Sequence, residues 1–188
     1  MCKEIASNHG QPYRSINLYF QDESRFGLFT KNGKALTAKG VKPICPFQQV
    51  FQSTYIYGAF SPINGEYFML EMPRCDAENF QVFLNEFSSL NPDEFKIVVL
   101  DNGAFHKAAK LSIPKNIILV FLPPYSPELN PAEKIWQRIK RNFTNRLHSS
   151  LANLSKFIDD EVKQLNNEIV ISTCSFQYIF LDSFWTIL

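Results

Sequence analysis

Two acidic residues stand where the surrounding sequence predicts a rigid site. Asp101 directly follows the short apolar run 96–100, and Glu133 follows a segment, residues 123–131, that contains four prolines. Short runs rich in β-branched residues are typical of buried strands, and the C-terminal ends of such strands are where open α/β sheets bind ligands. Because prolines restrict φ, the proline-rich segment fixes the direction in which the chain begins the helix that carries Glu133.

The helix that carries Glu133 has a clear predicted start, with Asn130 as the N-cap and Pro131 as the first helical residue. Glu133 lies about 85° from the centre of the apolar stripe, at the edge of the buried face. Glu133 therefore either serves a site or completes a capping box with Asn130. Asp101 likewise either serves a site or caps the turn that follows it. The stripe consists of Ala132, Ile135, Trp136, Ile139, Phe143 and Leu147.

A third acid, Asp22, follows a predicted strand over residues 16–21. Side chains alternate along a strand, so Asp22 shares a face with Leu18 and Phe20, whereas Glu23 points the other way. A helix separates this part of the chain from the strand 96–100, and such a crossover favours parallel pairing. If the two strands are neighbours, Asp22 and Asp101 lie side by side.

Three segments built around these acids, residues 22–27, 100–107 and 122–133, together resemble the catalytic domain of mariner-type insertion-sequence transposases of the DDE superfamily. The proline loop that leads to Asn-Pro-x-Glu is the most specific element, and the match covers roughly residues 16–165. The resemblance implies an α/β, ribonuclease-H-like fold, in which a mixed sheet combines an antiparallel three-strand meander with parallel strands and is flanked by helices. It also implies that Asp22, Asp101 and Glu133 are the catalytic and metal-binding residues.

The activity that this resemblance implies is metal-dependent DNA transposition, in which phosphodiester hydrolysis is followed by strand transfer. Three carboxylates without a Cys/His cluster select Mg²⁺ or Mn²⁺, and two ions about 4 Å apart suit an in-line displacement. The implied partners are the DNA of the element ends and of the target, and a second copy of the chain in the active complex. Only 21 residues precede Asp22, so a separate helix-turn-helix product is expected to recognise the ends. Two alternatives remain open: an inactive remnant that only binds DNA or a partner, and another nuclease of the same fold.

Basic side chains near the three acids are candidate DNA contacts. Residues 25–49 contain no acid and resemble a basic hairpin or loop, while the helix that carries Glu133 places basic residues opposite its apolar stripe. Either surface binds phosphates or is simply solvated. His106 contacts a phosphate, orients Asp101 or lies on the surface as an ordinary polar residue. The candidates are Arg25, Lys31, Lys34, Lys39, Lys42, His106, Lys107, Lys134, Arg138 and Arg141.

Composition favours a single domain, since the chain has 188 residues. The net charge of +1 neither requires nor excludes nucleic acid. The four cysteines are scattered without a C-x-x-C motif, and no secretory signal is seen, so a cytoplasmic protein is expected, nucleoid-associated if bacterial. The expected organisation is a lead-in (1–15), the catalytic domain (16–168) and an apolar tail (169–188) that packs on the domain or against a partner.

The remaining predicted elements follow from local signals. Residues 52–60 and 66–72 form an antiparallel hairpin around the turn Asn64-Gly65. A helix capped by Asp76 extends to about residue 90, and a last helix covers residues 149–167. The aromatic spacing within the first of these helices indicates core packing.

Overall fold

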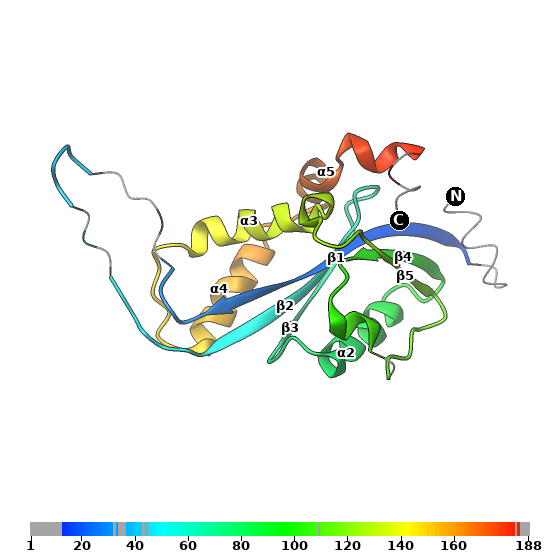
Figure 1. Ribbon diagram of the computed structural model, residues 1–188, viewed down its shortest axis with the longest axis horizontal. Helices are drawn as coiled ribbons and strands as arrows, with labels where there is room; N and C mark the ends of the chain where they lie inside the picture. Colours follow the sequence, from blue (N-terminus) through cyan, green and yellow to red (C-terminus); the bar gives the residue numbers. More distant parts are fainter. Residues whose placement is uncertain are drawn as a thin grey trace.

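The chain is built around a five-stranded sheet whose order is β3-β2-β1-β4-β5, so that β1 has a neighbour on each side (Figure 1). The computed structural model describes residues 13–31, 33, 37–42, 44, 46–108, 110–182 and 184. The strands are β1 (Ser15–Gly27), β2 (Ser53–Phe60), β3 (Tyr67–Met72), β4 (Glu94–Leu100) and β5 (Ile117–Phe121). The helices are α2 (Ala77–Ser89), α3 (Ala132–Phe143), α4 (Leu151–Val162) and α5 (Asn167–Cys174), with short 3₁₀ helices η1 (Ala104–Lys107), η2 (Pro127–Leu129) and η3 (Gln177–Phe180).

The strand directions confirm the predicted mixed sheet. β1, β2 and β3 form an antiparallel meander, while β4 pairs in parallel with both β1 and β5. In the β1–β4 ladder Phe20 aligns with Val99. Continuing that register brings Asp22 level with Asp101, which directly follows β4. The predicted adjacency of these two strands is therefore correct.

The two faces of the sheet are covered by different helices. α2 lies on one face, while α3, α4 and α5 cover the other (Figure 1). Because side chains alternate along β1, Tyr19 packs with the aromatic residues of α2, whereas Leu18 and Phe20 belong to the core beneath α3. The α2 layer is rich in phenylalanine, and its buried members are Phe80, Phe83 and Phe87. This confirms that the aromatic spacing of α2 is core packing.

The start of α2 agrees with the prediction, whereas the start of α3 differs from it by one residue. Asp76 caps α2 by accepting a hydrogen bond from the Asn79 backbone N–H at 2.9 Å. α3 begins at Ala132, with Pro131 at the N-cap, one residue later than predicted. Asn130 nevertheless accepts a hydrogen bond from the Ala132 N–H at 3.1 Å, so its side chain still serves one free donor of the helix.

Three predicted boundaries are corrected by the structure. β1 runs to Gly27, well beyond the predicted residues 16–21, so Asp22 lies inside the strand and Arg25 pairs with Tyr55 of β2 instead of lying in a loop. α3 ends at Phe143, which leaves Leu147 outside the helix and 45 % exposed. The predicted helix over residues 149–167 ends at Val162, because α4 and α5 are separate and Asn166 caps α5.

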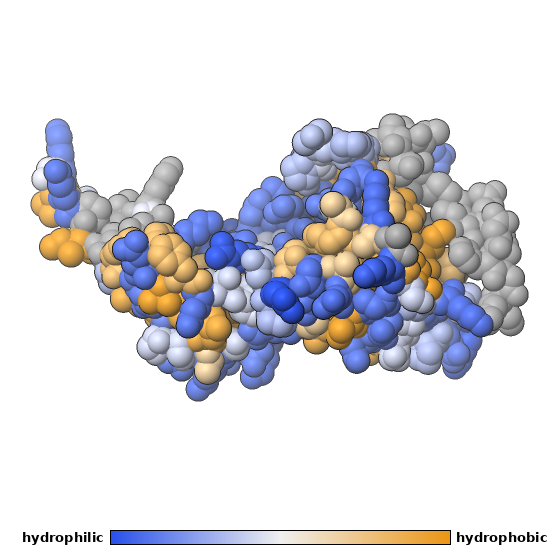
Figure 2. All heavy atoms as spheres, turned by 60° about the horizontal axis from the view of Figure 1, so that its bottom comes forward, coloured by the Kyte–Doolittle hydropathy of each residue, from blue (hydrophilic) through white to orange (hydrophobic). Residues whose placement is uncertain are grey.

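Between β1 and β2 the chain projects far from the sheet (Figure 1). The pairing of the two strands continues briefly through the Leu28 N–H, which donates to the Gln52 carbonyl oxygen at 2.9 Å. In Figure 2 the outer part of this segment shows both hydrophilic and hydrophobic residues on its surface. Its described, exposed apolar side chains are Phe29, Val41, Ile44, Phe47 and Phe51.

The described part of the C-terminal segment packs on the domain. Val170 and Cys174 of α5, together with Ile179 and Phe184, are buried in the core beneath α3. The sequence left open whether this segment packs on the domain or against a partner, and its described residues pack on the domain. At the other end, residues 1–12 lie outside the described residues, and β1 begins at Ser15. Among the described residues, no helix has the length and apolar character needed to cross a membrane.

The adjacent residues Ile179 and Phe180 test this packing. Ile179 is 1 % exposed and Phe180 is 59 % exposed. Ile179→Ala should lower the free energy of unfolding by about 2–5 kcal/mol, because it leaves a cavity in the core. Phe180→Ala, the matched control, should change it by less than about 0.5 kcal/mol. Urea unfolding of both variants measures the difference, and equal effects would contradict the buried position of Ile179.

Candidate active site

Asp22 reaches the α3 side of the sheet from the middle of β1. Its Oδ2 accepts a hydrogen bond from Trp136 Nε1 at 2.9 Å. Gly58, the β2 partner of Asp22, leaves room for the indole, because a Cβ atom there would lie 2.8 Å from Trp136 Cη2. The pairing of β1 with β2 thus places Gly58 beside Asp22, and the small size of Gly58 lets the Trp136 ring reach the Asp22 carboxylate.

Asp101 follows the C-terminal end of β4, and its side chain is 60 % exposed. The Gly103 backbone N–H donates to Asp101 Oδ1 at 2.9 Å, and His106 Nδ1 lies 2.9 Å from the same oxygen. These contacts, led by that with His106, lower the pKa of Asp101. Asp101 is therefore an exposed, ionised carboxylate with one oxygen held by the protein.

Glu133 is positioned through its neighbour Asn130. Asn130 is buried, and its Nδ2 donates to the Gln21 carbonyl oxygen at 2.9 Å while its Oδ1 accepts from the Ala132 N–H. One side chain thus joins the start of α3 to β1 at the residue before Asp22. Glu133, in the first turn of α3, is held on the same side of the sheet as Asp22.

The pKa of Asp22 responds to burial and to the charges of other acids. Burial, followed by the charges of Glu23, Glu133 and Asp101, raises the pKa of Asp22 to about 8. Among the described residues, no three His, Cys, Asp or Glu side chains are grouped closely enough to hold a metal ion as they stand. The donor set nevertheless fits a hard divalent cation, since Asp22, Asp101 and Glu133 all offer carboxylate oxygens.

Two hollows flank the proline-rich segment that leads to α3. One of about 390 Å³ is lined by Asp101, the turn after it and residues 122–127. The other, of about 350 Å³, is lined by Glu133 and Phe176 among others. Tyr125 stands beside the first hollow with its side chain fully exposed and its φ at +58°. Both hollows open next to candidate acids, so the site has room for an extended substrate.

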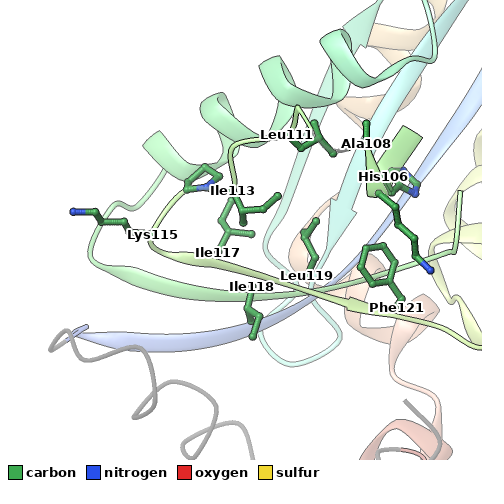
Figure 3. Close-up of a pocket in the computed structure, with 11 residues that line it drawn as sticks. His106, Ala108, Leu111, Ile113, Lys115, Ile117, Ile118, Leu119 and Phe121 are labelled. Carbon is green, nitrogen blue, oxygen red and sulfur yellow. The ribbon is translucent and has the colours of Figure 1, made fainter. Parts of the chain in front are cut away.

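A larger pocket lies elsewhere and has different chemistry. It has a volume of about 450 Å³ and runs along the edge strand β5, with His106 and Phe121 at one end and Ile113 and Lys115 at the other (Figure 3). The described residues that line it include no carboxylate, and most are apolar. The acids of the candidate site therefore do not face this pocket.

A family comparison covers most of the chain. A family described as DDE superfamily endonuclease matches residues 17–155, a span that contains all three acids. The chain belongs to this family. The uncharacterized protein y4pE/y4sA of Sinorhizobium fredii is 42 % identical to this DDE endonuclease over 95 residues, which are 50 % of this chain and 70 % of that protein.

Solved structures of Mos1 complexes share the fold. A pre-cleavage Mos1 transpososome matches with a TM-score of 0.66 and 15 % identity, over 92 % of this chain and 56 % of that one. The Mos1 mariner paired end complex with Mn matches with a TM-score of 0.65 and 16 % identity, over 84 % and 51 %. The DDE endonuclease thus spans about half the length of the Mos1 chains. The likeness confirms the predicted ribonuclease-H-like fold.

The structure assigns His106 to the interior of the DDE endonuclease, which corrects its expected role as a DNA contact. It is 3 % exposed, and its Nε2 lies 3.0 Å from Glu23 Oε1 while Nδ1 faces Asp101. Burial disfavours the charged imidazole, but the two carboxylates outweigh burial and raise the pKa of His106 to about 9. Both ring nitrogens are engaged, so neither is available to a phosphate.

Lys140 is a further candidate for the site that the sequence patterns did not indicate. It lies seven residues after Glu133, which is about two helical turns, so the two share a face of α3. Its Nζ lies 5.4 Å from the Phe26 ring centroid. Burial and then Lys31 lower the pKa of Lys140, while Glu133 and Asp22 oppose that change. The seven-residue spacing was the signal that could have identified it.

The other predicted DNA contacts are on the surface. Eight of them are described and exposed, and Lys34 lies outside the described residues. The Lys107 side chain lies against the edge strand β5, with its Nζ 4.8 Å from the Phe121 ring centroid. The exposed residues are Arg25, Lys31, Lys39, Lys42, Lys107, Lys134, Arg138 and Arg141. Their contact with DNA stays a prediction.

The raised pKa of Asp22 predicts a pH-dependent stability in the metal-free protein. Its value rises from 3.8 to about 8 on folding, so between these pH values the folded protein keeps a proton that the unfolded chain releases. Stability should therefore fall as the pH rises through this window. Asp22→Asn keeps an acceptor for Trp136 and should remove this slope, raising the unfolding midpoint at pH 8 by about 2–4 °C for each kcal/mol of repulsion relieved.

Thermal unfolding in EDTA at pH 4 to 8 measures this effect. The variant and the wild type should converge near pH 4 and separate toward pH 8. Asp159→Asn, an exposed acid on α4, is the matched control and should follow the wild type. Parallel profiles for wild type and Asp22→Asn would show that folding does not raise the pKa of Asp22.

Proposed function

We propose that this DDE endonuclease is the catalytic domain of a DNA transposase that hydrolyses a phosphodiester bond and then transfers the freed strand. The observation that supports the proposal is the placement of the three acids: Asp22 lies on β1, Asp101 follows the neighbouring strand β4 at the level of Asp22, and Glu133 lies in the first turn of α3 on the Asp22 side of the sheet. Family membership over residues 17–155 supports it. So does the shared fold with chains whose structures are described as Mos1 strand transfer and paired-end complexes.

Asp22, Asp101 and Glu133 would hold Mg²⁺ or Mn²⁺, and we propose two ions. When bound, such ions neutralise charge on the attacking and leaving oxygens of the phosphodiester. We propose Asp101 as the main ligand, because its exposed carboxylate follows the strand next to Asp22 and keeps one oxygen free of the Gly103 and His106 contacts. Trp136 keeps the Asp22 carboxylate oriented through its Nε1–H. The Gly103 N–H likewise keeps the Asp101 carboxylate oriented through its Oδ1.

DNA would lie across the exposed end of the sheet. Lys140 and the exposed basic residues of α3 would contact phosphates next to the acids, which supplies affinity without base recognition. The exposed ring of Tyr125 offers a surface on which a base can stack. Since strand transfer joins two element ends, we propose that two copies act together and that a separate helix-turn-helix product recognises the ends.

The catalytic assignment is tested with purified protein, supercoiled plasmid DNA and Mn²⁺. Asp101→Asn and Glu133→Gln should each reduce strand cleavage by on the order of 10³-fold or more, because each removes a charged metal ligand. Asp159→Asn and Glu86→Gln, which change exposed acids on other helices, are the matched controls and should retain activity. Full activity in either site variant would refute the assignment. DNA binding without any effect of divalent metal would favour the binding-only alternative.

Lys140→Met tests the DNA surface while keeping the apolar stem against Phe26. Removing one phosphate contact should weaken DNA binding on all sequences alike and reduce the slope of log affinity against log salt by about 1. Lys163→Met on α4 is the matched control, because Lys163 is 76 % exposed and pairs with Asp160. Fluorescence anisotropy with a labelled duplex at several salt concentrations measures the slopes. Equal slopes for Lys140→Met and wild type would exclude Lys140 as a phosphate contact.

A further inference from the structure

The carboxylate of Asp101 is held by the protein through Oδ1. The Gly103 N–H donates to this oxygen, and His106 Nδ1 lies 2.9 Å from it. The imidazole nitrogen and the carboxylate oxygen are therefore in close polar contact. Because the side chain is 60 % exposed, Oδ2 is left to bind a ligand from solution.

His106 is itself immobilised by its surroundings. Its ring centroid lies 4.6 Å from that of Phe80 and 4.1 Å from that of Phe105. On the side away from Asp101, Nε2 lies 3.0 Å from Glu23 Oε1, which also accepts from Gln21 Nε2 at 2.7 Å. A buried ring held by two aromatic neighbours and a carboxylate has little freedom to turn.

Glu23 and Gly103 complete this arrangement. The Glu23 side chain is only 9 % exposed and reaches His106 from the face of β1 opposite to Asp22. At Gly103, an added Cβ would lie 3.0 Å from His106 Nδ1 and 3.1 Å from Asp101 Oδ1. The absence of a side chain at Gly103 therefore permits the close approach of His106 to Asp101.

We infer that His106 is a positioning residue for the Asp101 carboxylate and that Glu23 fixes the orientation of His106. This inference rests on the proposed function, because it concerns the residues behind the same metal site. The chain of contacts from Glu23 through His106 holds Oδ1 of Asp101 and presents the other oxygen to the ion. Partners that orient a ligand in this way commonly contribute 10- to 100-fold in metal affinity.

Two substitutions at His106 separate its two contacts. In His106→Asn the amide nitrogen takes the place of Nδ1 and faces Asp101, whereas in His106→Gln it takes the place of Nε2 and faces Glu23. Calorimetric titration with Mn²⁺, in the absence of DNA, should show affinity about 10- to 100-fold weaker for His106→Gln and close to the wild type for His106→Asn. His148→Asn, which changes another buried histidine beside Phe143 and Phe157, is the matched control. Circular dichroism confirms that each variant is folded.

The outcomes distinguish this inference from the function on which it rests. Rescue by His106→Asn but not by His106→Gln supports positioning, because a purely structural role would not depend on which nitrogen is retained. Wild-type affinity in both variants, or an equal loss in both and in His148→Asn, would overturn the role of His106 alone. A wild-type protein that binds no Mn²⁺ would contradict the proposed function itself.

Discussion

The geometry of the candidate site depends on Asn130, which joins the start of α3 to the middle of β1. One amide donates to the backbone of Gln21 and accepts from the first turn of the helix. The bonds are buried, so solvent does not compete for them. Glu133 comes from a helix and Asp22 from a strand, and this amide fixes one relative to the other. The four prolines before α3 restrict the remaining freedom of the segment.

This arrangement places Asp22 where the protein compensates its ionised form poorly. Burial and the neighbouring acids make ionisation of Asp22 unfavourable, while Trp136 offers only a neutral donor. Lys140 approaches from the helix but is partly buried, which disfavours its own charge. Under the proposed function, divalent ions would supply the compensating positive charge, and their binding would also stabilise the folded state.

Sequence patterns were sufficient to predict how the central strands pair, whereas the assignment of the three acids stays a proposal. The apolar runs around Asp22 and Asp101, the helical crossover and alternation along β1 correctly predicted which strands are neighbours and which face Asp22 occupies. They were insufficient where a residue depends on packing between distant segments. His106 is buried because α2 supplies Phe80 and β1 supplies Glu23, and no local pattern reports either contact. The two-turn spacing of Lys140 from Glu133, by contrast, is visible in the sequence alone.

The central claim is that Asp22, Asp101 and Glu133 bind divalent ions together. The most direct test is anomalous diffraction from crystals soaked in Mn²⁺. If these three residues bind the ions, anomalous peaks will lie within about 2.5 Å of carboxylate oxygens from Asp22, Asp101 and Glu133. Manganese that binds only at other positions, while these three side chains keep their present contacts, would contradict it.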